Sequence, residues 1–209
     1  KEVGKTVIFV NNSGSAIGLV PETQTCDAIL QSWYGGESGG QAVADVLFGD
    51  YNPSGKLPVT FYRDTTQLAD FEDYDMNGRT YRYMKEDPLF KFGFGLSYTT
   101  FKIGDAIVPK QEIAQGQPLQ FTVPVSNTGD RSGTEILQVY LRKVDDTDGP
   151  VKTLKQFKRV ELKPGEQQQV SIEIAPESFQ FYSEDKLEMA AEPGAYTIFY
   201  GNSSDEADL

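Results

Sequence analysis

The residues best suited to chemistry in this chain follow one another in a short glycine-rich segment. Trp33 and Tyr34 come directly after an apolar run, and Glu37 lies inside the following loop, GGESGG. A loop that leaves the carboxyl end of a parallel strand is where α/β folds place their ligands. Trp33, Tyr34 and Glu37 are therefore candidates for the rim of a binding site. In the alternative interpretation, which is favoured, Glu37 and Ser38 cap the following helix, whose dipole favours negative charge.

A second candidate site is the acidic segment DYDMNG at residues 73–78. Its alternating Asp and Asn residues and its glycine imitate the beginning of a calcium-binding EF-hand loop. The twelfth position of such a loop should be a bidentate Glu, but here it is Met84, and the flanks do not have a helical pattern. We therefore expect no metal site. The acidic side chains are expected to pair with Arg79 or Arg82, or to lie in a solvated turn.

Two further segments combine aromatic residues with cations or glycines. In RTYRY (residues 79–83), tyrosines could stack on sugar rings while arginines bind hydroxyl groups, or the same residues could hold a linker in place. The structural role is favoured. FKFGFGL (residues 90–96) lacks the lysine-serine ending and the helix of a phosphate loop. Its glycines are expected to let the backbone pass closely between packed aromatic rings.

Composition excludes several classes of function. The 209 residues contain no histidine, which removes Ser-His-Asp triads and most zinc sites, and Cys26 is the only cysteine. Without a histidine partner, Cys26 is expected to be a small buried hydrophobic residue. The formal charge of −12 argues against nucleic acid and against anionic membranes. No run of residues reaches the length of a membrane span, and no cofactor is indicated.

The pattern of hydrophobic residues divides the chain into an α/β part and an all-β part, joined by a linker. The first 63 residues are typical of an α/β sheet, with buried parallel strands at 6–10 and 27–33 and a helix at 41–48 that ends at Gly49. Only two strands of the sheet are visible, whereas a doubly wound sheet needs about five or six. Residues 64–100 form an irregular linker, rich in aromatic residues.

From residue 101 to residue 205 the pattern becomes all-β. Alternating runs at 119–126, 135–142, 168–174 and 195–200 are separated by turn signals. This pattern indicates an immunoglobulin-like β-sandwich, of fibronectin type III because it lacks a Cys–Trp–Cys signature. The polar end of the chain is expected to fray, and residues 206–209 are assigned as a tail. Six aromatic residues are expected to face the core rather than to form a carbohydrate-binding face: Tyr140, Phe157, Phe179, Phe181, Tyr182 and Tyr196.

These segments together resemble a known family. The run AILQSWYGGESGGQAVADVLFGDYNPSGKLPVTFY resembles the second half of the α/β domain of glycoside hydrolase family 3. EDYDMNGRTYRYMKEDPLFKFGFGLSYTTF resembles the segment after that domain in the family, and GTEILQVYL, FKRVELKPGE and EPGAYTIFYG resemble the closing fibronectin type III-like domain. The run DYDMNGRTYRY is most similar to the β-xylosidase and β-glucosidase branches.

The resemblance implies a retaining β-glycosidase with two catalytic carboxylates, about 5–5.5 Å apart. In the family, the nucleophilic Asp lies in an N-terminal (β/α)8 barrel and the acid/base Glu lies upstream of the part matched here. We therefore assign no catalytic residue to this chain. It is expected to support an enzyme that removes terminal β-D-glucosyl or β-D-xylosyl residues, and to be inactive alone. The alternative is a non-catalytic module that binds carbohydrate or another protein.

The resemblance also sets expectations for partners. The chain should pack against a barrel and the first half of the α/β domain, neither of which it contains. The exposed edge of a truncated sheet can pair with another chain, so a homodimer through this edge is a further expectation. The family favours a periplasmic or secreted location, although no leader is visible in the sequence.

Overall fold

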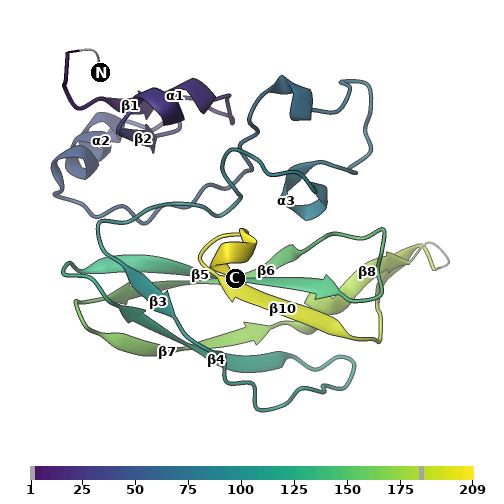
Figure 1. The fold of residues 1–209 in the computed structure, drawn as a ribbon. Helices are drawn as coiled ribbons and strands as arrows, with labels where there is room; N and C mark the ends of the chain where they lie inside the picture. Colours follow the sequence, from purple (N-terminus) through teal and green to yellow (C-terminus); the bar gives the residue numbers. More distant parts are fainter. Residues whose placement is uncertain (1–2, 184–185) are drawn as a thin grey trace.

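The computed structural model describes residues 3–183 and 186–209, which form an α/β part, a linker and a β-sandwich (Figure 1). The α/β part and the helical portion of the linker lie side by side above the sandwich in this view. The C-terminus lies between the linker and the upper sheet of the sandwich.

The α/β part is built on two parallel strands. β1 (Ile8–Asn11) pairs with β2 (Ala28–Gln31) in the register Ile8 with Ala28. Both overlap the predicted strands. The connection contains α1 (Val20–Thr25), which the sequence analysis did not predict and which has a proline in its first turn, where a missing N–H costs nothing.

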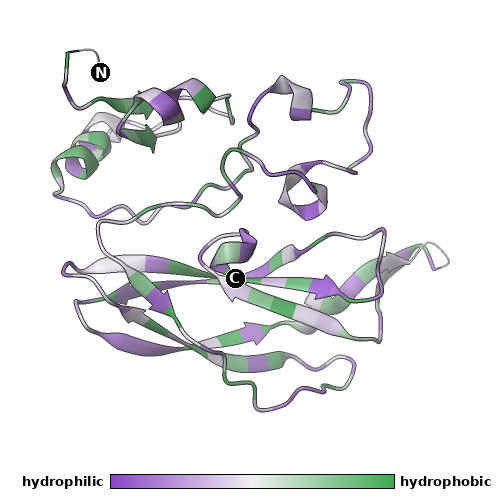
Figure 2. Ribbon diagram, viewed as in Figure 1, coloured by the Kyte–Doolittle hydropathy of each residue, from purple (hydrophilic) through white to green (hydrophobic). Residues whose placement is uncertain are grey.

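The predicted helix follows β2 as α2 (Gly39–Phe48) and starts two residues earlier than expected. Gly49 ends it with φ of 83°, the left-handed conformation that glycine adopts without strain. None of the residues of α2 is buried. In Figure 2 much of this helix and of the neighbouring strands has the colour of hydrophobic residues.

The linker contains little regular structure, but it is closely packed. It includes the 3-10 turn η1 (Thr65–Gln67) and the one-turn helix α3 (Thr80–Tyr83). Phe61, which is 1 % exposed, forms an isolated antiparallel bridge with Phe90, and Phe90 stacks on Phe94 with ring centroids 5.4 Å apart. A Cβ atom at Gly95 would collide with the carbonyl oxygen of Gly55. The glycines of the segment therefore permit a close approach, but to the Gly55 carbonyl and, at Gly93, to the side-chain amide of Gln138 rather than to aromatic rings.

The sandwich consists of two three-stranded antiparallel sheets and a separate hairpin. Its sheets have the strand orders β10-β5-β6 and β3-β4-β7, and the hairpin joins β8 to β9. The alternation of the sequence predicted four of these strands, β4, β5, β7 and β10, and missed the others. The bounds are β3 Phe101–Ile103, β4 Leu119–Asn127, β5 Gly133–Lys143, β6 Thr153–Leu162, β7 Gln167–Ile174, β8 Gln180–Ser183, β9 Glu188–Ala191 and β10 Tyr196–Gly201, with the 3-10 turns η2 Pro176–Phe179 and η3 Glu206–Asp208.

The hydrophobic core lies between the two sheets. Side chains alternate along β4 and β7, so every second residue faces the opposite sheet, as Figure 2 shows by its alternating colours. The core consists of Leu119, Phe121, Val123, Val125, Leu137, Val139, Val160, Leu162, Val170, Ile172 and Ile174. Burial of this apolar area is the main force that stabilises the sandwich. The described chain is thus mostly β, with a small α/β part.

Two expectations about the sandwich were wrong. Phe157 and Tyr182 are each 59 % exposed, so they do not face the core, whereas Tyr140 is fully buried. The end of the chain does not fray. Ser203 and Ser204 are 1 % and 4 % exposed, because the last residues turn back over Gly201 and bind the linker. Among the described residues, no helix is long and apolar enough to cross a membrane.

Candidate functional site

The loop after β2 begins at Trp33, which the strand pairing holds in place. The backbone N–H and the Oγ of Ser32 both donate to the carbonyl oxygen of Asn11, at 2.9 and 3.0 Å, so the carboxyl ends of β1 and β2 are joined. Trp33 then takes a left-handed φ of 54°, which is unusual for a side chain of this size. Its ring packs edge-on against Phe61 at 6.2 Å. The indole is thereby fixed where the loop leaves the sheet.

A polar cluster supports this edge of the sheet. Asn11 is 6 % exposed, and its Nδ2 donates to Gln31 Oε1 at 2.5 Å and to Ser13 Oγ at 2.9 Å. Gln31 Nε2 donates in turn to the Ser13 carbonyl at 3.3 Å. Buried side-chain amides that are satisfied in this way hold a single arrangement of the strand ends. The sequence analysis did not identify this cluster.

Tyr34 and Glu37 are presented to solvent. Tyr34 is 76 % exposed, and its ring lies over Gly14, where an added Cβ would come within 2.6 Å of the ring. Glu37 is exposed in a turn closed by the Gly39 N–H on the Gly36 carbonyl at 2.9 Å. Its carboxylate makes no hydrogen bond or ion pair with any described residue. Ser38 occupies the N-cap position of α2, but its side chain accepts no capping hydrogen bond. The capping role expected of Ser38 is therefore wrong.

The acidic segment 73–78 is organised by its own backbone. Asp73 Oδ1 accepts from the Asp75 N–H at 2.9 Å, and Asp75 Oδ1 accepts from the Asn77 N–H at 2.8 Å. Arg79 donates to the carbonyl oxygens of Asp73 and Asp75 rather than to their carboxylates, and residues 73–78 are exposed, which agrees with the second expectation, a solvated turn. In the described part of the chain, no group of three or more acidic or cysteine side chains is arranged to hold a metal ion.

The RTYRY segment binds the sandwich. Tyr81 Oη accepts from the Leu154 N–H at 3.0 Å, and the Arg82 carbonyl accepts from the Val151 N–H at 2.6 Å. The Tyr81 ring stacks on Phe92, with centroids 4.2 Å apart, and burial raises the pKa of its hydroxyl. These residues hold the linker in place as expected, and their partner within this chain is the sandwich.

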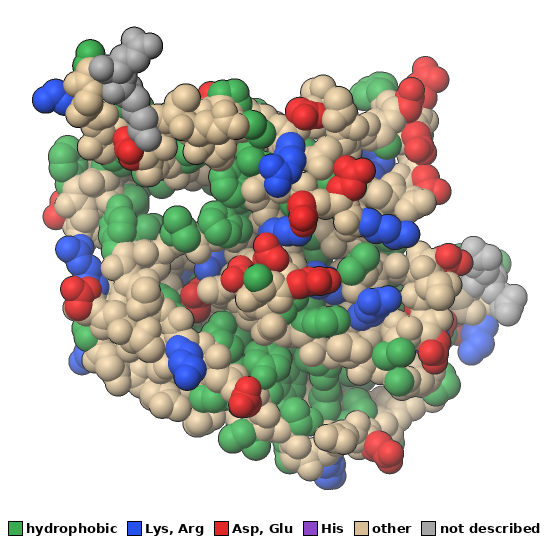
Figure 3. Space-filling model, in the orientation of Figure 1, with side chains coloured by type: hydrophobic (Ala, Val, Ile, Leu, Met, Phe, Trp, Pro, Cys, Tyr) green, Lys and Arg blue, Asp and Glu red, His purple; other side chains and the backbone are tan. Residues whose placement is uncertain are grey.

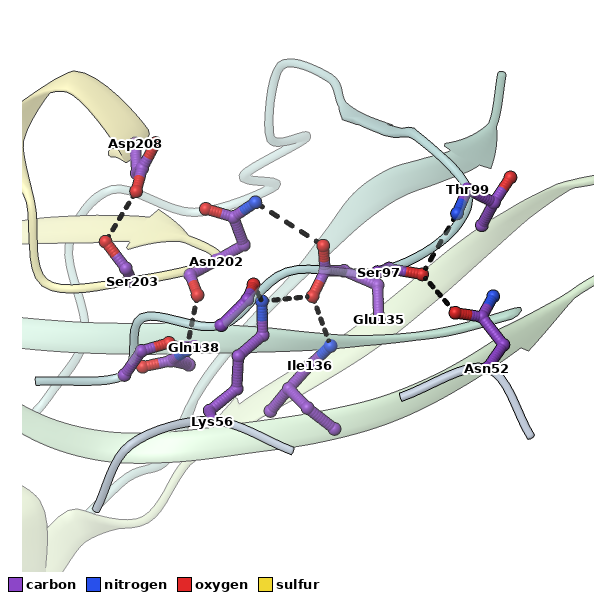
Figure 4. Close-up of polar contacts among 12 residues, drawn as sticks. Asn52, Lys56, Ser97, Thr99, Glu135, Ile136, Gln138, Asn202, Ser203 and Asp208 are labelled. Carbon is purple, nitrogen blue, oxygen red and sulfur yellow. Dashed lines mark hydrogen bonds and ion pairs between the residues drawn. The ribbon is translucent and has the colours of Figure 1, made fainter. Parts of the chain in front are cut away.

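A buried polar network completes the junction between linker and sandwich (Figure 4). Lys56 Nζ lies 2.9 Å from Glu135 Oε1, and Asn202 Nδ2 donates to Glu135 Oε2 at 3.4 Å. Gln138 Nε2 donates to the carbonyls of Gly93, at 3.0 Å, and Asn202, at 2.6 Å. One signal for this network was visible in the sequence, because Glu135 occupies a core-facing position of an alternating strand and needs a buried partner there.

Comparisons with known proteins place this geometry in a family. A model described as the glycosyl hydrolase family 3 C-terminal domain matches residues 1–98, and one described as a fibronectin type III-like domain matches residues 135–204. The chain belongs to glycoside hydrolase family 3. It corresponds to the C-terminal portion of that family, which confirms the resemblance read from the sequence.

Relatives within glycoside hydrolase family 3 carry two kinds of name. The chain is 52 % identical to a xylan 1,4-beta-xylosidase of Xylanibacter ruminicola, matching 100 % of this chain and 24 % of the relative. It is 41 % identical to a periplasmic beta-glucosidase of Salmonella typhimurium, matching 98 % of this chain and 28 % of the relative. The chain therefore spans about a quarter of the length of the curated relatives that it matches.

Solved structures from the same family match the fold. A beta-glucosidase from Listeria innocua in complex with glucose superposes with a TM-score of 0.84 at 33 % identity, covering 98 % of this chain and 30 % of that one. A β-glucosidase from Erythrobacter marinus gives a TM-score of 0.85 at 39 % identity, covering 98 % and 27 %. The sandwich and the α/β part thus have the arrangement found in these longer proteins.

Proposed function

We propose that this chain is the supporting C-terminal region of a retaining β-glycosidase that releases terminal β-D-xylosyl or β-D-glucosyl residues. Retention requires two carboxyl groups about 5–5.5 Å apart on opposite sides of the anomeric carbon. Glu37 is the only acidic residue of residues 32–40, the loop that leaves β2, so this loop does not supply a pair of carboxylates. The nucleophile and the acid/base are therefore assigned to polypeptide outside this chain.

One observation carries the proposal: the α/β part is too small to bury its own apolar surface. The sheet has two strands, and α2 has no buried residue. Ile8, Val10 and Phe48 are 45 %, 37 % and 84 % exposed. Figure 3 shows hydrophobic side chains gathered over this part of the molecule. An apolar surface of this kind is expected to pack against further strands and helices.

Within this function, Trp33, Tyr34 and Glu37 would form part of the rim of the sugar site. They lie at the carboxyl edge of a parallel sheet, where α/β folds bind ligands. Trp33 is fixed against Phe61, while Tyr34 and Glu37 are exposed without polar partners among the described residues. A free carboxylate and an exposed ring can bind hydroxyl groups and sugar faces. The names of the relatives support xylosides and glucosides as substrates.

Hydrolysis of p-nitrophenyl β-D-xyloside and β-D-glucoside tests this proposal. The chain alone should release nitrophenol at the rate of buffer. The longer polypeptide, which continues upstream through a barrel and the first half of the α/β domain, should turn over at least one of the two substrates. Turnover by the 209-residue chain alone would overturn the proposal. Binding of glycans by a longer polypeptide that hydrolyses neither substrate would favour the non-catalytic module instead.

A further inference from the structure

A cavity lies where the linker, the beginning of β6 and the C-terminal turn meet. Its volume is about 360 Å³. Each wall is held by a backbone hydrogen bond: the Val151 N–H donates to the Arg82 carbonyl at 2.6 Å, and the Ser204 N–H donates to the Phe92 carbonyl at 2.9 Å. The cavity is thus a fixed feature of the junction. Its size is at the lower end of the range for small-molecule sites.

Two hydroxyl groups in this cavity have no hydrogen-bond partner. Thr60 is 6 % exposed and Ser204 is 4 % exposed, and both residues line the cavity. Thr60 Oγ1 and Ser204 Oγ are both buried and make no hydrogen bond. Leaving a buried hydroxyl unpaired costs about 1–3 kcal/mol. Both residues line one cavity although they are far apart in the sequence, and a polar occupant of the cavity would supply the partners that their hydroxyls lack.

A buried cation faces the same space. Lys152 is 6 % exposed, and its ammonium group makes no hydrogen bond or ion pair with any residue that the structure describes. It lies 5.7 Å from the centre of the Phe199 ring, a cation–π contact. Burial lowers the pKa of its ammonium group, while the carboxylates of Glu206 and Asp205 act in the opposite direction from a longer distance. The Lys152 ammonium group therefore lacks a hydrogen-bond acceptor, and a ligand placed between it and these carboxylates could supply one.

The balance of charge around the cavity favours a neutral occupant. Three cations and four carboxylates line it, so neither an anion nor a cation gains a strong net attraction. Figure 3 shows acidic and basic side chains intermingled around the C-terminal turn. Donors and acceptors stand side by side, which suits a molecule whose groups both donate and accept. The charged residues are Lys85, Glu86, Asp87, Lys91, Lys152, Asp205 and Glu206.

We propose that this cavity binds a neutral polyhydroxylated molecule of monosaccharide size, held by Lys152, Ser204 and Thr60. The ammonium group would donate to one hydroxyl oxygen, and the two side-chain hydroxyls would each donate to or accept from others. Tyr81, Phe92 and Val151 supply the apolar part of the wall. The proposal goes beyond the supporting role and does not rest on it, because every wall belongs to this chain.

Titration of the chain with D-xylose and D-glucose, followed by amide chemical shifts, tests the proposal. Saturable shifts at Lys152 and Ser204 are expected, with a dissociation constant on the order of 1–10 mM for so small a ligand. Lys152→Met keeps the aliphatic stem and should weaken binding about tenfold, as expected for the loss of a charged hydrogen bond. Lys158→Met, at an exposed position of β6, should leave binding unchanged.

The alternatives give different results. Saturable shifts with inorganic phosphate or acetate but not with either sugar would show an anion site and overturn the proposal. The absence of saturable shifts with any of these probes would show a water-filled cavity and also overturn it. Since Lys152→Met could unfold the junction, Ser204→Ala provides a second variant. It should weaken sugar binding severalfold while the amide spectrum of the sandwich core stays as in the parent chain.

Discussion

The ammonium group of Lys56 and the carboxylate of Glu135 form an ion pair of 2.9 Å inside the junction, where their side chains are 12 % and 6 % exposed. Lys56 Nζ also donates to the Gly95 carbonyl at 3.0 Å, and the Ile136 N–H donates to Glu135 Oε1 at 2.8 Å. Both charges are therefore paired and hydrogen-bonded, which is the condition for burying them. The pair joins the segment between α2 and the linker to β5 and so ties the α/β part to the sandwich.

Removal of one member of this pair should destabilise the chain strongly. Lys56→Met leaves the Glu135 carboxylate buried without its cation, and we expect the free energy of unfolding to fall by about 3 kcal/mol. Lys91→Met is the matched control, because the Asp87 side chain of its ion pair is 79 % exposed and exposed ion pairs contribute little to stability. Urea denaturation measures both. Equal losses in the two variants would contradict the assignment of Lys56–Glu135 as a buried pair.

Close approach of the backbone at Gly93 gives a second prediction. Gly93 has a φ of 79°, and a Cβ there would collide with the side-chain amide of Gln138. Gly116 has nearly the same φ, 81°, but nothing within 4 Å of an added Cβ. Gly116→Ala should cost only the left-handed strain, roughly 1 kcal/mol, whereas Gly93→Ala should cost a further ~1–3 kcal/mol. Thermal denaturation of both variants measures the difference, and a difference near zero would show that Gln138 moves away freely.

Because the hydroxyl of Tyr140 is buried, we expect the folded chain to lose stability at alkaline pH. Its side chain is fully buried and donates to Gln138 Oε1 at 2.6 Å, and burial raises the pKa of its hydroxyl far above the ordinary value of 10.0. The unfolded chain then releases this proton first. The stabilising contribution is complete below about pH 10 and is lost as the pH rises towards the folded pKa.

Tyr140→Phe tests this dependence on pH. At pH 7 the variant should lose about 1 kcal/mol of unfolding free energy with the hydrogen bond, while its stability should fall less steeply above pH 10. Tyr182→Phe, at a position that is 59 % exposed, serves as the control and should keep the steep alkaline loss. An unchanged alkaline slope in Tyr140→Phe would refute the assignment to Tyr140.

The elements that the sequence predicted well have one buried face that alternates strictly. Along β4 and β7, Leu119 to Val125 and Val170 to Ile174 place an apolar residue at every second position. β6 was missed because its first half is half-buried under the linker and because the apolar Phe157 is exposed beside charged residues, so apolar and polar positions do not alternate clearly. Local pattern thus predicts a strand only where one face meets the core.

The junction could not be predicted because its contacts join residues that are far apart in sequence. Tyr81 and Leu154 are separated by 73 positions, and Gln138 and Asn202 by 64. The acidic C-terminal residues indicated a frayed end, but Ser203 and Ser204 are buried: the Ser204 N–H donates to the Phe92 carbonyl of the linker, and the Ser203 hydroxyl donates to Asp208 Oδ2. Local sequence patterns do not predict such contacts, because they form only when distant segments pack together. The glycine loop with Trp33, Tyr34 and Glu37 was placed correctly after a strand, since strand, loop and helix follow one another directly.

The rim proposed at the carboxyl edge of β2 predicts an effect of Glu37 on catalysis. Glu37→Gln in the longer polypeptide removes a charge but preserves shape, and we expect kcat/KM for p-nitrophenyl β-D-xyloside or β-D-glucoside to fall severalfold. Glu72→Gln, which changes an exposed glutamate of the linker, should leave kcat/KM unchanged. Steady-state kinetics and thermal denaturation would be measured together. A change smaller than twofold in Glu37→Gln would leave this residue without a role at the rim.

The open edge of the two-stranded sheet predicts self-association of the 209-residue chain. β1 pairs with β2 on one side only, and its Ile8 and Val10, on the same face, are partly exposed. An unpaired edge with apolar side chains is a template for a second copy, so we propose that the chain dimerises there. Val10→Lys places a charge at this edge and should shift the chain towards monomer. Val144→Lys, which alters a valine of the sandwich that is 47 % exposed against 37 % for Val10, should not shift it. Light scattering over a range of concentrations measures the mass, and a parent chain that stays monomeric throughout would show that the edge does not pair.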